Sequence, residues 1–220
     1  MRRLLAPIAL TVILSACGGG SSSTASYSSI AAKRAELGIV RAYIPHGRYG
    51  RCRVRYMRPR YITVHSTQNY SRSASASAHA EMLRRGKFKG RKNSLGYVTW
   101  HYTVDDHSVY QSLPDREQGQ HADYEGRGNR HSIGIEMCEN RGNSRSRTTD
   151  RTAQLVAQLI HEHGIPLRKV VPHQHWRMIR YSDGCDLGHK NCPHFLLENG
   201  KPGRKWRVFL RKVKSYYNRY

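Results

Sequence analysis

The sequence predicts an α/β fold in which helices flank a mixed central β-sheet within a single domain. Two observations lead to this expectation: short β-rich runs alternate with segments of helical periodicity, and a tight turn joins two of the runs into a hairpin. The chain has 220 residues, of which 38% are hydrophobic, and this is enough for one modest core plus tails. We expect the folded domain at 45–220.

The expected strands begin at 61–64 (YITV), a compact run of β-branched and aromatic residues. The run 97–104 (YVTWHYTV) leads through a short turn into a returning strand at 109–112, and this pattern is typical of a hairpin. Further strands are expected at 132–138 (SIGIEMC) and 169–171. Together they supply the sheet.

Apolar residues at helical spacing predict the flanking helices. One helix is expected at 74–85, and a second runs from a cap at Thr149 or Asp150 to residue 163. A closing helix is expected at 206–217. Shorter helices are expected at 29–37 and 193–197.

The N-terminal residues have the pattern of an export signal. Two arginines precede an apolar run at 4–14, which is too short for the ~20 residues of a membrane-spanning helix. The sequence LSAC at 14–17 resembles a bacterial lipobox, so we expect a lipoprotein signal peptide at 1–16 and lipidation of Cys17; ordinary secretion is the alternative. The glycine after Cys17 favours, by analogy, the periplasmic face of the outer membrane of a Gram-negative bacterium. Residues 17–44 are expected to form a flexible Gly/Ser tether and a short helix.

The net charge of +23 arises from 38 Lys and Arg against 15 Asp and Glu. Such a surface attracts polyanions such as nucleic acid, anionic lipid or an anionic cell wall, and charge alone does not choose among them. No zinc-finger pair, helix-turn-helix or aromatic RNA-binding motif is present in the sequence, so we expect no nucleic-acid partner. We expect the chain to be a monomer held at a membrane through the lipid anchor.

Three residues have the chemistry and the positions of metal ligands. His65 stands at the carboxyl end of a strand run, which is the sheet edge where ligands bind in open α/β folds. His173 follows a short strand, and Cys192 lies in the run KNCPH. Two imidazoles and a thiolate are good zinc ligands, and three protein ligands leave the fourth position open, as in catalytic sites.

Six short motifs follow one another along the chain, among them ITVHST at 62–67, VPHQHW at 171–176 and KNCP at 190–193. The other three are 100–111, 121–122 and 129–136. Over about 61–195 the chain thereby resembles the zinc-dependent N-acetylmuramoyl-L-alanine amidases (amidase type 2), related to phage lysozyme amidases and peptidoglycan recognition proteins. The resemblance implies hydrolysis of the amide bond between N-acetylmuramic acid and L-alanine in peptidoglycan or muropeptides.

The resemblance also assigns roles to residues. It implies a zinc cofactor, Zn²⁺, with His65, His173 and Cys192 as metal ligands and His175 as the fallback for His173. It also implies that Glu136 is the general base and that Lys190 faces the oxyanion. Trp100 and His121 are then expected to line the sugar–peptide groove. Strand parity supports the base, because Glu136 and Gly134 share one strand face while Ile133, Ile135 and Met137 share the apolar one. For Lys190, one more basic surface residue is the alternative.

Several alternatives remain open. The same fold occurs in non-catalytic peptidoglycan-binding modules, although the full ligand set favours an enzyme. The segment 177–189 is longer than the usual spacing between ligands, and it is either a lid over the groove or a surface loop. Cys52, Cys138 and Cys185 include a candidate disulfide, while Cys138 is equally explained as strand core.

Overall fold

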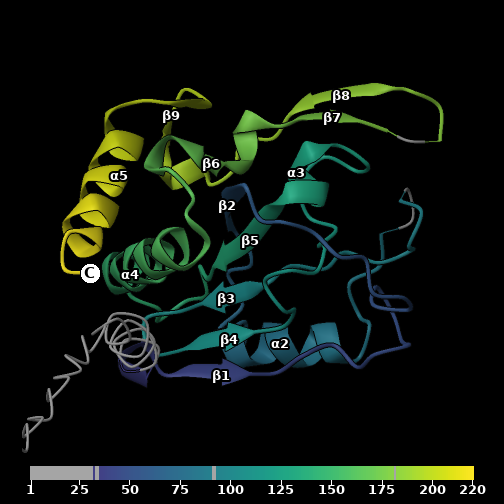
Figure 1. Ribbon diagram of the computed structural model, residues 1–220, viewed down its shortest axis with the longest axis horizontal. Coiled ribbons are helices and arrows are strands. Elements are labelled where there is room, and N and C mark those ends of the chain that lie inside the picture. The colour runs from purple at the N-terminus through teal and green to yellow at the C-terminus, as the bar shows by residue number, and fades with distance from the viewer. Residues whose placement is uncertain (1–31, 33–34, 91–92, 181) are drawn as a thin grey trace, which may run out of the picture.

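The computed structural model describes residue 32 and residues 35–90, 93–180 and 182–220. A six-stranded sheet forms its centre, in the order β1-β4-β3-β5-β2-β6 (Figure 1). The β3–β4 pair is antiparallel and every other neighbouring pair is parallel, which confirms a mixed sheet. The strands are β1 (Ile39–Arg41), β2 (Tyr61–Ser66), β3 (Tyr102–Val104), β4 (Val109–Gln111), β5 (Ser132–Met137) and β6 (Val170–Pro172).

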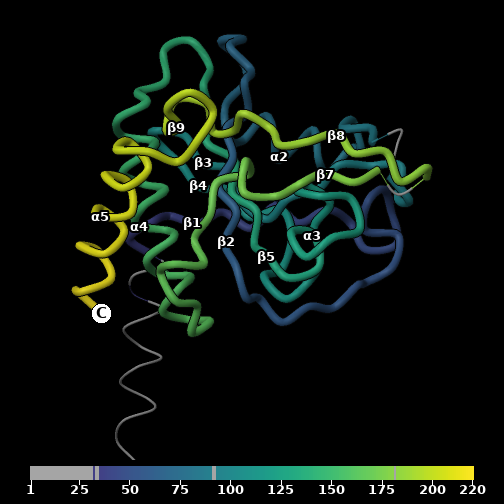
Figure 2. The backbone as a smooth tube through the Cα atoms, turned by 90° about the horizontal axis from the view of Figure 1, so that it is seen from above, coloured from purple at the N-terminus to yellow at the C-terminus, as the bar shows by residue number. Residues whose placement is uncertain are grey.

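Helices cover both faces of this sheet. In Figure 2, α4 (Arg145–His163) and α5 (Arg204–Tyr217) lie on one side of the strands and α2 (Ala76–Arg84) lies on the other. The short helix α3 (Arg127–His131) leads directly into β5. No helix in the described part of the chain combines the length and the apolar character that a bilayer crossing demands.

Two small two-stranded sheets and three short 3-10 helices complete the fold. The hairpin of β7 (Arg177–Ile179) and β8 (Asp186–His189) extends away from the central sheet (Figure 1). The other pair is β9 (Leu197–Glu198) with β10 (Lys201–Pro202). The 3-10 helices are Leu167–Lys169, His173–His175 and His194–Leu196.

The main hydrophobic core lies between the sheet and α4 with α5. Alternate residues of β5 point into it, because Ile133, Ile135 and Met137 are fully buried there. Leu155 of α4 and Phe209 of α5 close this core from the other side. The opposite face of the same strands is therefore free to carry polar residues, as the parity of β5 predicts.

Several elements differ from the expectations. The domain start expected at residue 45 misses β1, which pairs in parallel with β4. Helix α4 begins earlier than Thr149, because Ser144 caps it and its hydroxyl accepts a hydrogen bond from the backbone N–H of Arg147. The helix expected at 29–37 falls mostly outside the described residues, as do the signal peptide at 1–16 and Cys17.

Candidate metal centre

The structure brings the three expected ligands together. His65 is the penultimate residue of β2, His173 follows β6, and Cys192 follows the β7–β8 hairpin, so three separate chain segments meet at one sheet edge. The two imidazole nitrogens and the sulfur all lie within 4.8 Å of one another, and all three side chains are buried. His175, the fallback for His173, is exposed, and its ring lies tilted beside Tyr61 instead.

The geometry of these three side chains suits a zinc ion. The Nδ1 atoms of His65 and His173 face each other at 2.9 Å. Burial, followed by the neighbouring imidazoles of His173 and His121, lowers the pKa of His65 well below its usual range, and burial lowers the pKa of His173 to about 4. Both rings are therefore neutral and able to donate lone pairs at neutral pH.

The thiol of Cys192 contacts a polar group of the backbone. The backbone N–H of Ser66 donates to its sulfur at 3.3 Å, which stabilises a thiolate. Burial and the nearby Glu136 raise the pKa of Cys192 to about 12, so a bound cation would be needed to ionise this thiol at neutral pH. Two imidazoles and a thiol that needs a cation fit zinc.

Glu136 stands beside the ligands because of strand register. In the parallel β2–β5 pair it is the direct partner of His65, and its Oε1 lies 3.9 Å from the Nδ1 of that ring. Its Oε2 is buried and has no hydrogen-bond partner among the described residues. Burial raises the pKa of Glu136 to about 8, and the positive charge of Lys190 opposes that rise. Such a carboxyl can accept and release a proton near neutral pH.

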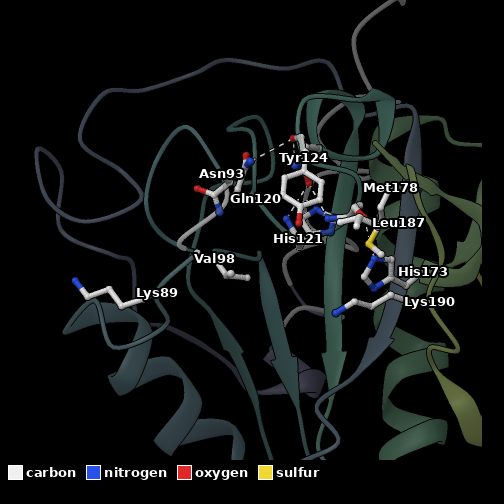
Figure 3. Close-up of a pocket in the computed structure, with 13 residues that line it drawn as sticks. Lys89, Asn93, Val98, Gln120, His121, Tyr124, His173, Met178, Leu187 and Lys190 are labelled. Atoms are coloured by element: carbon white, nitrogen blue, oxygen red, sulfur yellow. Dashed lines mark hydrogen bonds between the residues drawn. The ribbon is translucent and has the colours of Figure 1, made fainter. Parts of the chain in front are cut away.

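A pocket of about 510 Å³ opens beside the candidate centre, and His173 is the one of the three ligands that lines it. Figure 3 shows His121, His173 and Lys190 gathered at one end of it, with Met178 and Leu187 of the β7–β8 hairpin beside them. Lys190 is exposed and places its charge close enough to lower the pKa of both Glu136 and His65. The hairpin therefore forms part of the pocket wall.

Of the two residues expected to line the groove, only one does so. Trp100 does not line the groove wall: it is 4% exposed and packs with Leu83 and Phe88 in a second core cluster, while its indole N–H donates to Thr103. A large apolar ring next to α2 gains more from burial than from exposure in the groove. His121 does line the pocket, but its ring also contacts His65, with the Nδ1 of His121 lying 3.0 Å from the Nε2 of His65.

Sequence reasoning missed the roles of four further residues at the site. The carbonyl of Ala122 lies 2.8 Å from the Nε2 of His173. Asn129 holds the backbone of the 121–122 segment, and Met178 and Leu187 face the pocket. The segment 121–122 matches a family motif, but a role that depends on backbone atoms leaves no signature in residue types.

A family model described as "Amidase_2: N-acetylmuramoyl-L-alanine amidase" matches residues 55–195. The chain belongs to this amidase family. The matched span contains all three candidate ligands and Glu136, so the amidase-family domain and the candidate centre coincide.

Curated relatives of the amidase-family chain come from Bacillus subtilis. It is 38% identical over 161 residues to the N-acetylmuramoyl-L-alanine amidase CwlH, covering 72% of this chain and 54% of that protein. It is 40% identical over 163 residues to the N-acetylmuramoyl-L-alanine amidase XlyA, and the match covers 74% of this chain and 48% of that protein. The chain thus spans about half the length of these relatives.

Solved structures confirm the amidase fold. A mutant endolysin from Bacillus subtilis superposes with a TM-score of 0.65 at 38% identity, covering 80% of this chain and 97% of that one. The catalytic domain of XlyA superposes with a TM-score of 0.63 at 38% identity, covering 80% of this chain and 98% of that one. The predicted α/β fold with a mixed sheet and flanking helices is therefore confirmed.

The location expected for this amidase-family chain is wrong. Its relatives are cell-wall amidases and endolysins of Bacillus, a Gram-positive genus, and they do not support the outer membrane of a Gram-negative bacterium.

The cysteines also differ from one expectation: Cys52, Cys138, Cys185 and Cys192 are all free in the described ranges. Cys138 is buried directly after β5, in agreement with a core role.

Proposed function

We propose that this chain is a zinc-dependent N-acetylmuramoyl-L-alanine amidase that hydrolyses the amide bond between N-acetylmuramic acid and L-alanine in peptidoglycan. The observation that carries the proposal is the convergence of His65, His173 and Cys192 within 4.8 Å beside the buried carboxyl of Glu136. A non-catalytic peptidoglycan-binding module is the second candidate. A complete ligand set next to a carboxyl with a raised pKa favours the enzyme, because binding alone requires neither.

The ligands and their neighbours have distinct tasks in the proposed reaction. When bound, zinc would activate a water molecule and polarise the scissile carbonyl. Glu136 is placed to accept a proton from the attacking water and to pass it to the leaving amine, since its pKa of about 8 permits both steps. Lys190 supplies a positive charge at the pocket end where negative charge develops on the carbonyl oxygen.

The pocket and the surface charge support a wall substrate. Met178 and Leu187 give the pocket an apolar wall, against which the aliphatic parts of a peptide or sugar would pack. The net charge of +23 attracts the anionic cell wall. Binding of the chain to isolated cell walls should weaken as salt is raised, because exposed charges are screened within about 10 Å at 0.1 M ionic strength.

The decisive experiment compares the unaltered chain with Glu136→Gln on purified muropeptides. Mass spectrometry should find free stem peptide from the unaltered chain, and Glu136→Gln should release it about 10²- to 10⁴-fold more slowly because the general base is lost. Glu81→Gln, which changes a half-exposed glutamate of α2, serves as the matched control and should keep the full rate.

Metal dependence is tested on the same assay. Dialysis against a chelator should abolish release of the stem peptide, and added Zn²⁺ should restore it. Equal release by the unaltered chain and Glu136→Gln would remove this carboxyl from the mechanism. Absence of any free stem peptide in the presence of zinc would instead support the binding module.

A further inference from the structure

The two histidine ligands share one outer support. The Nε2 of His65 lies 3.0 Å from the Nδ1 of His121, and the Nε2 of His173 lies 2.8 Å from the carbonyl oxygen of Ala122. Two adjacent residues of one loop therefore hold the second ring nitrogen of both imidazoles. Groups that bond a ligand's second nitrogen fix the orientation and the tautomer of the ring.

Hydrogen-bond chemistry then determines where each ring carries its proton. A carbonyl oxygen only accepts, so His173 must donate from Nε2 and keep a bare Nδ1. If His65 also presents a bare Nδ1, 2.9 Å from that of His173, its proton is on Nε2 and is donated to the Nδ1 of His121. The Nε2 of His121 then donates to the carbonyl of Ser132 at 3.4 Å. Each of the contacts made by an Nε2 atom then has one donor and one acceptor, and the two bare Nδ1 atoms face each other.

The 121–122 segment is itself firmly held. The side-chain oxygen of Asn129 accepts from the backbone N–H of His121 at 2.8 Å and from that of Ala122 at 2.7 Å. Asn129 is 2% exposed, and Asp123 accepts its backbone N–H at 2.8 Å. These hydrogen bonds thus fix the positions of His121 and of the Ala122 carbonyl relative to the sheet.

The sheet beneath is shaped to receive the His121 ring. Gly134 of β5 lies under it, and a Cβ added there would come within 2.8 Å of three ring atoms, closer than real Cβ contacts come. Since Gly134 neighbours Glu136 on the same strand face, the glycine clears the space that this ring needs. A larger residue would push His121 away from His65.

We propose that His121, held by Asn129 and seated on Gly134, is a positioning residue that fixes the tautomer of His65 and thereby sets the affinity of the centre for zinc. The inference rests on the proposed metal centre. It gives His121 a task toward the ligand rather than toward the sugar–peptide groove alone.

The test measures zinc affinity of the full chain by competition with a chelating indicator. His121→Leu removes the hydrogen bond at similar bulk and should weaken zinc binding about 10- to 100-fold. His121→Asn keeps an oxygen acceptor near the Nδ1 position and should recover most of the affinity. Gly134→Ala should weaken binding while leaving every ligand in place. His107→Leu, which removes an exposed histidine in the β3–β4 turn, is the matched control and should bind zinc as the unaltered chain does.

A second readout separates a positioning role from a merely structural one. In two-bond nitrogen–proton NMR spectra of the zinc-loaded chain, His65 should carry its proton on Nε2, and His121→Leu should lose that single-tautomer signature while His121→Asn retains it. Equal zinc affinity in His121→Leu and the unaltered chain overturns the inference even if turnover falls. Failure of the unaltered chain to bind zinc overturns the metal centre itself, and this appears before any variant is compared.

Discussion

The buried carboxyl of Glu136 should make the stability of the chain depend on pH in a defined direction. Its side chain is 16% exposed, its Oε2 has no hydrogen-bond partner among the described residues, and burial raises its pKa from 4.5 to about 8. Below pH 4.5 the carboxyl is protonated in both the folded and the unfolded chain. Between pH 4.5 and 8 the unfolded chain releases this proton while the folded chain retains it, so stability falls as pH rises through that window.

The size of this effect follows from the same shift. At about 1.4 kcal/mol per pKa unit, the raised pKa of Glu136 sets a ceiling of about 5 kcal/mol. Water penetration and the positive charge of Lys190 reduce it, and we expect about 2 kcal/mol. Glu136→Gln cannot ionise, so it should gain stability relative to the unaltered chain as pH rises from 4.5 to 8, and the difference should level off above pH 8.

The assay is urea denaturation of both chains, stripped of metal with a chelator, at a series of pH values. The difference in free energy of unfolding isolates position 136, because the other titrating groups are common to both chains. His65 lies 3.9 Å away, and burial lowers the pKa of this imidazole well below its usual range. A difference that stays constant between pH 4.5 and 9 would refute the reasoning, since it would mean that the carboxyl is no harder to ionise in the folded state.

Three further expectations concern other parts of the fold. Phe209→Ala, which empties a site of 2% exposure in the main core, should lower the free energy of unfolding in urea by about 3 to 5 kcal/mol and leave turnover per folded molecule unchanged. Asp105 accepts hydrogen bonds from the backbone of Ala76, His107 and Ser108, which outweigh burial and lower its pKa. Asp105→Asn should therefore lose about 1 to 3 kcal/mol at pH 7, and this loss should shrink as pH falls below 4, where the unaltered carboxylate is also neutralised. Leu187→Ala, at the 39%-exposed pocket wall, should raise KM about fivefold with little change in kcat, measured by steady-state kinetics on muropeptides.

The parts of the fold that follow local periodicity were predictable from the sequence. The alternation of residues 133–137 predicted that Ile133 and Ile135 enter the core while Gly134 and Glu136 face away, and the structure agrees. The placement of His65 at a strand end was equally readable, because parallel strands present their carboxyl ends at one edge.

The remaining parts depend on contacts between distant segments. β1 is three residues long, and pairing with β4 stabilises it, so its own sequence gives no clear signal. The β7–β8 hairpin lies in a polar, basic segment whose strands are mostly exposed, and hydrophobic alternation could not reveal it.

The site residues divide in the same way. Ligand chemistry, position beside predicted strands and the family resemblance pointed to His65, His173 and Cys192, since chemistry restricts which side chains bind zinc. Trp100 was placed wrongly because a strand residue next to a motif can face either side, and only the packing of α2 determines which. The contact of His121 with His65 joins residues that are 56 positions apart, and no local pattern reports it.

The pairing of His65 with Glu136 across β2 and β5 ties chemistry to sheet assembly. The paired residues of the two strands are 71 positions apart in sequence, and a slip of either strand by one position would turn its side chain into the apolar layer. No fragment that lacks either strand can present the ligand and the carboxyl together. In the proposed mechanism, hydrolysis therefore cannot begin before this long-range pairing has formed, and pairing between distant segments is intrinsically slow.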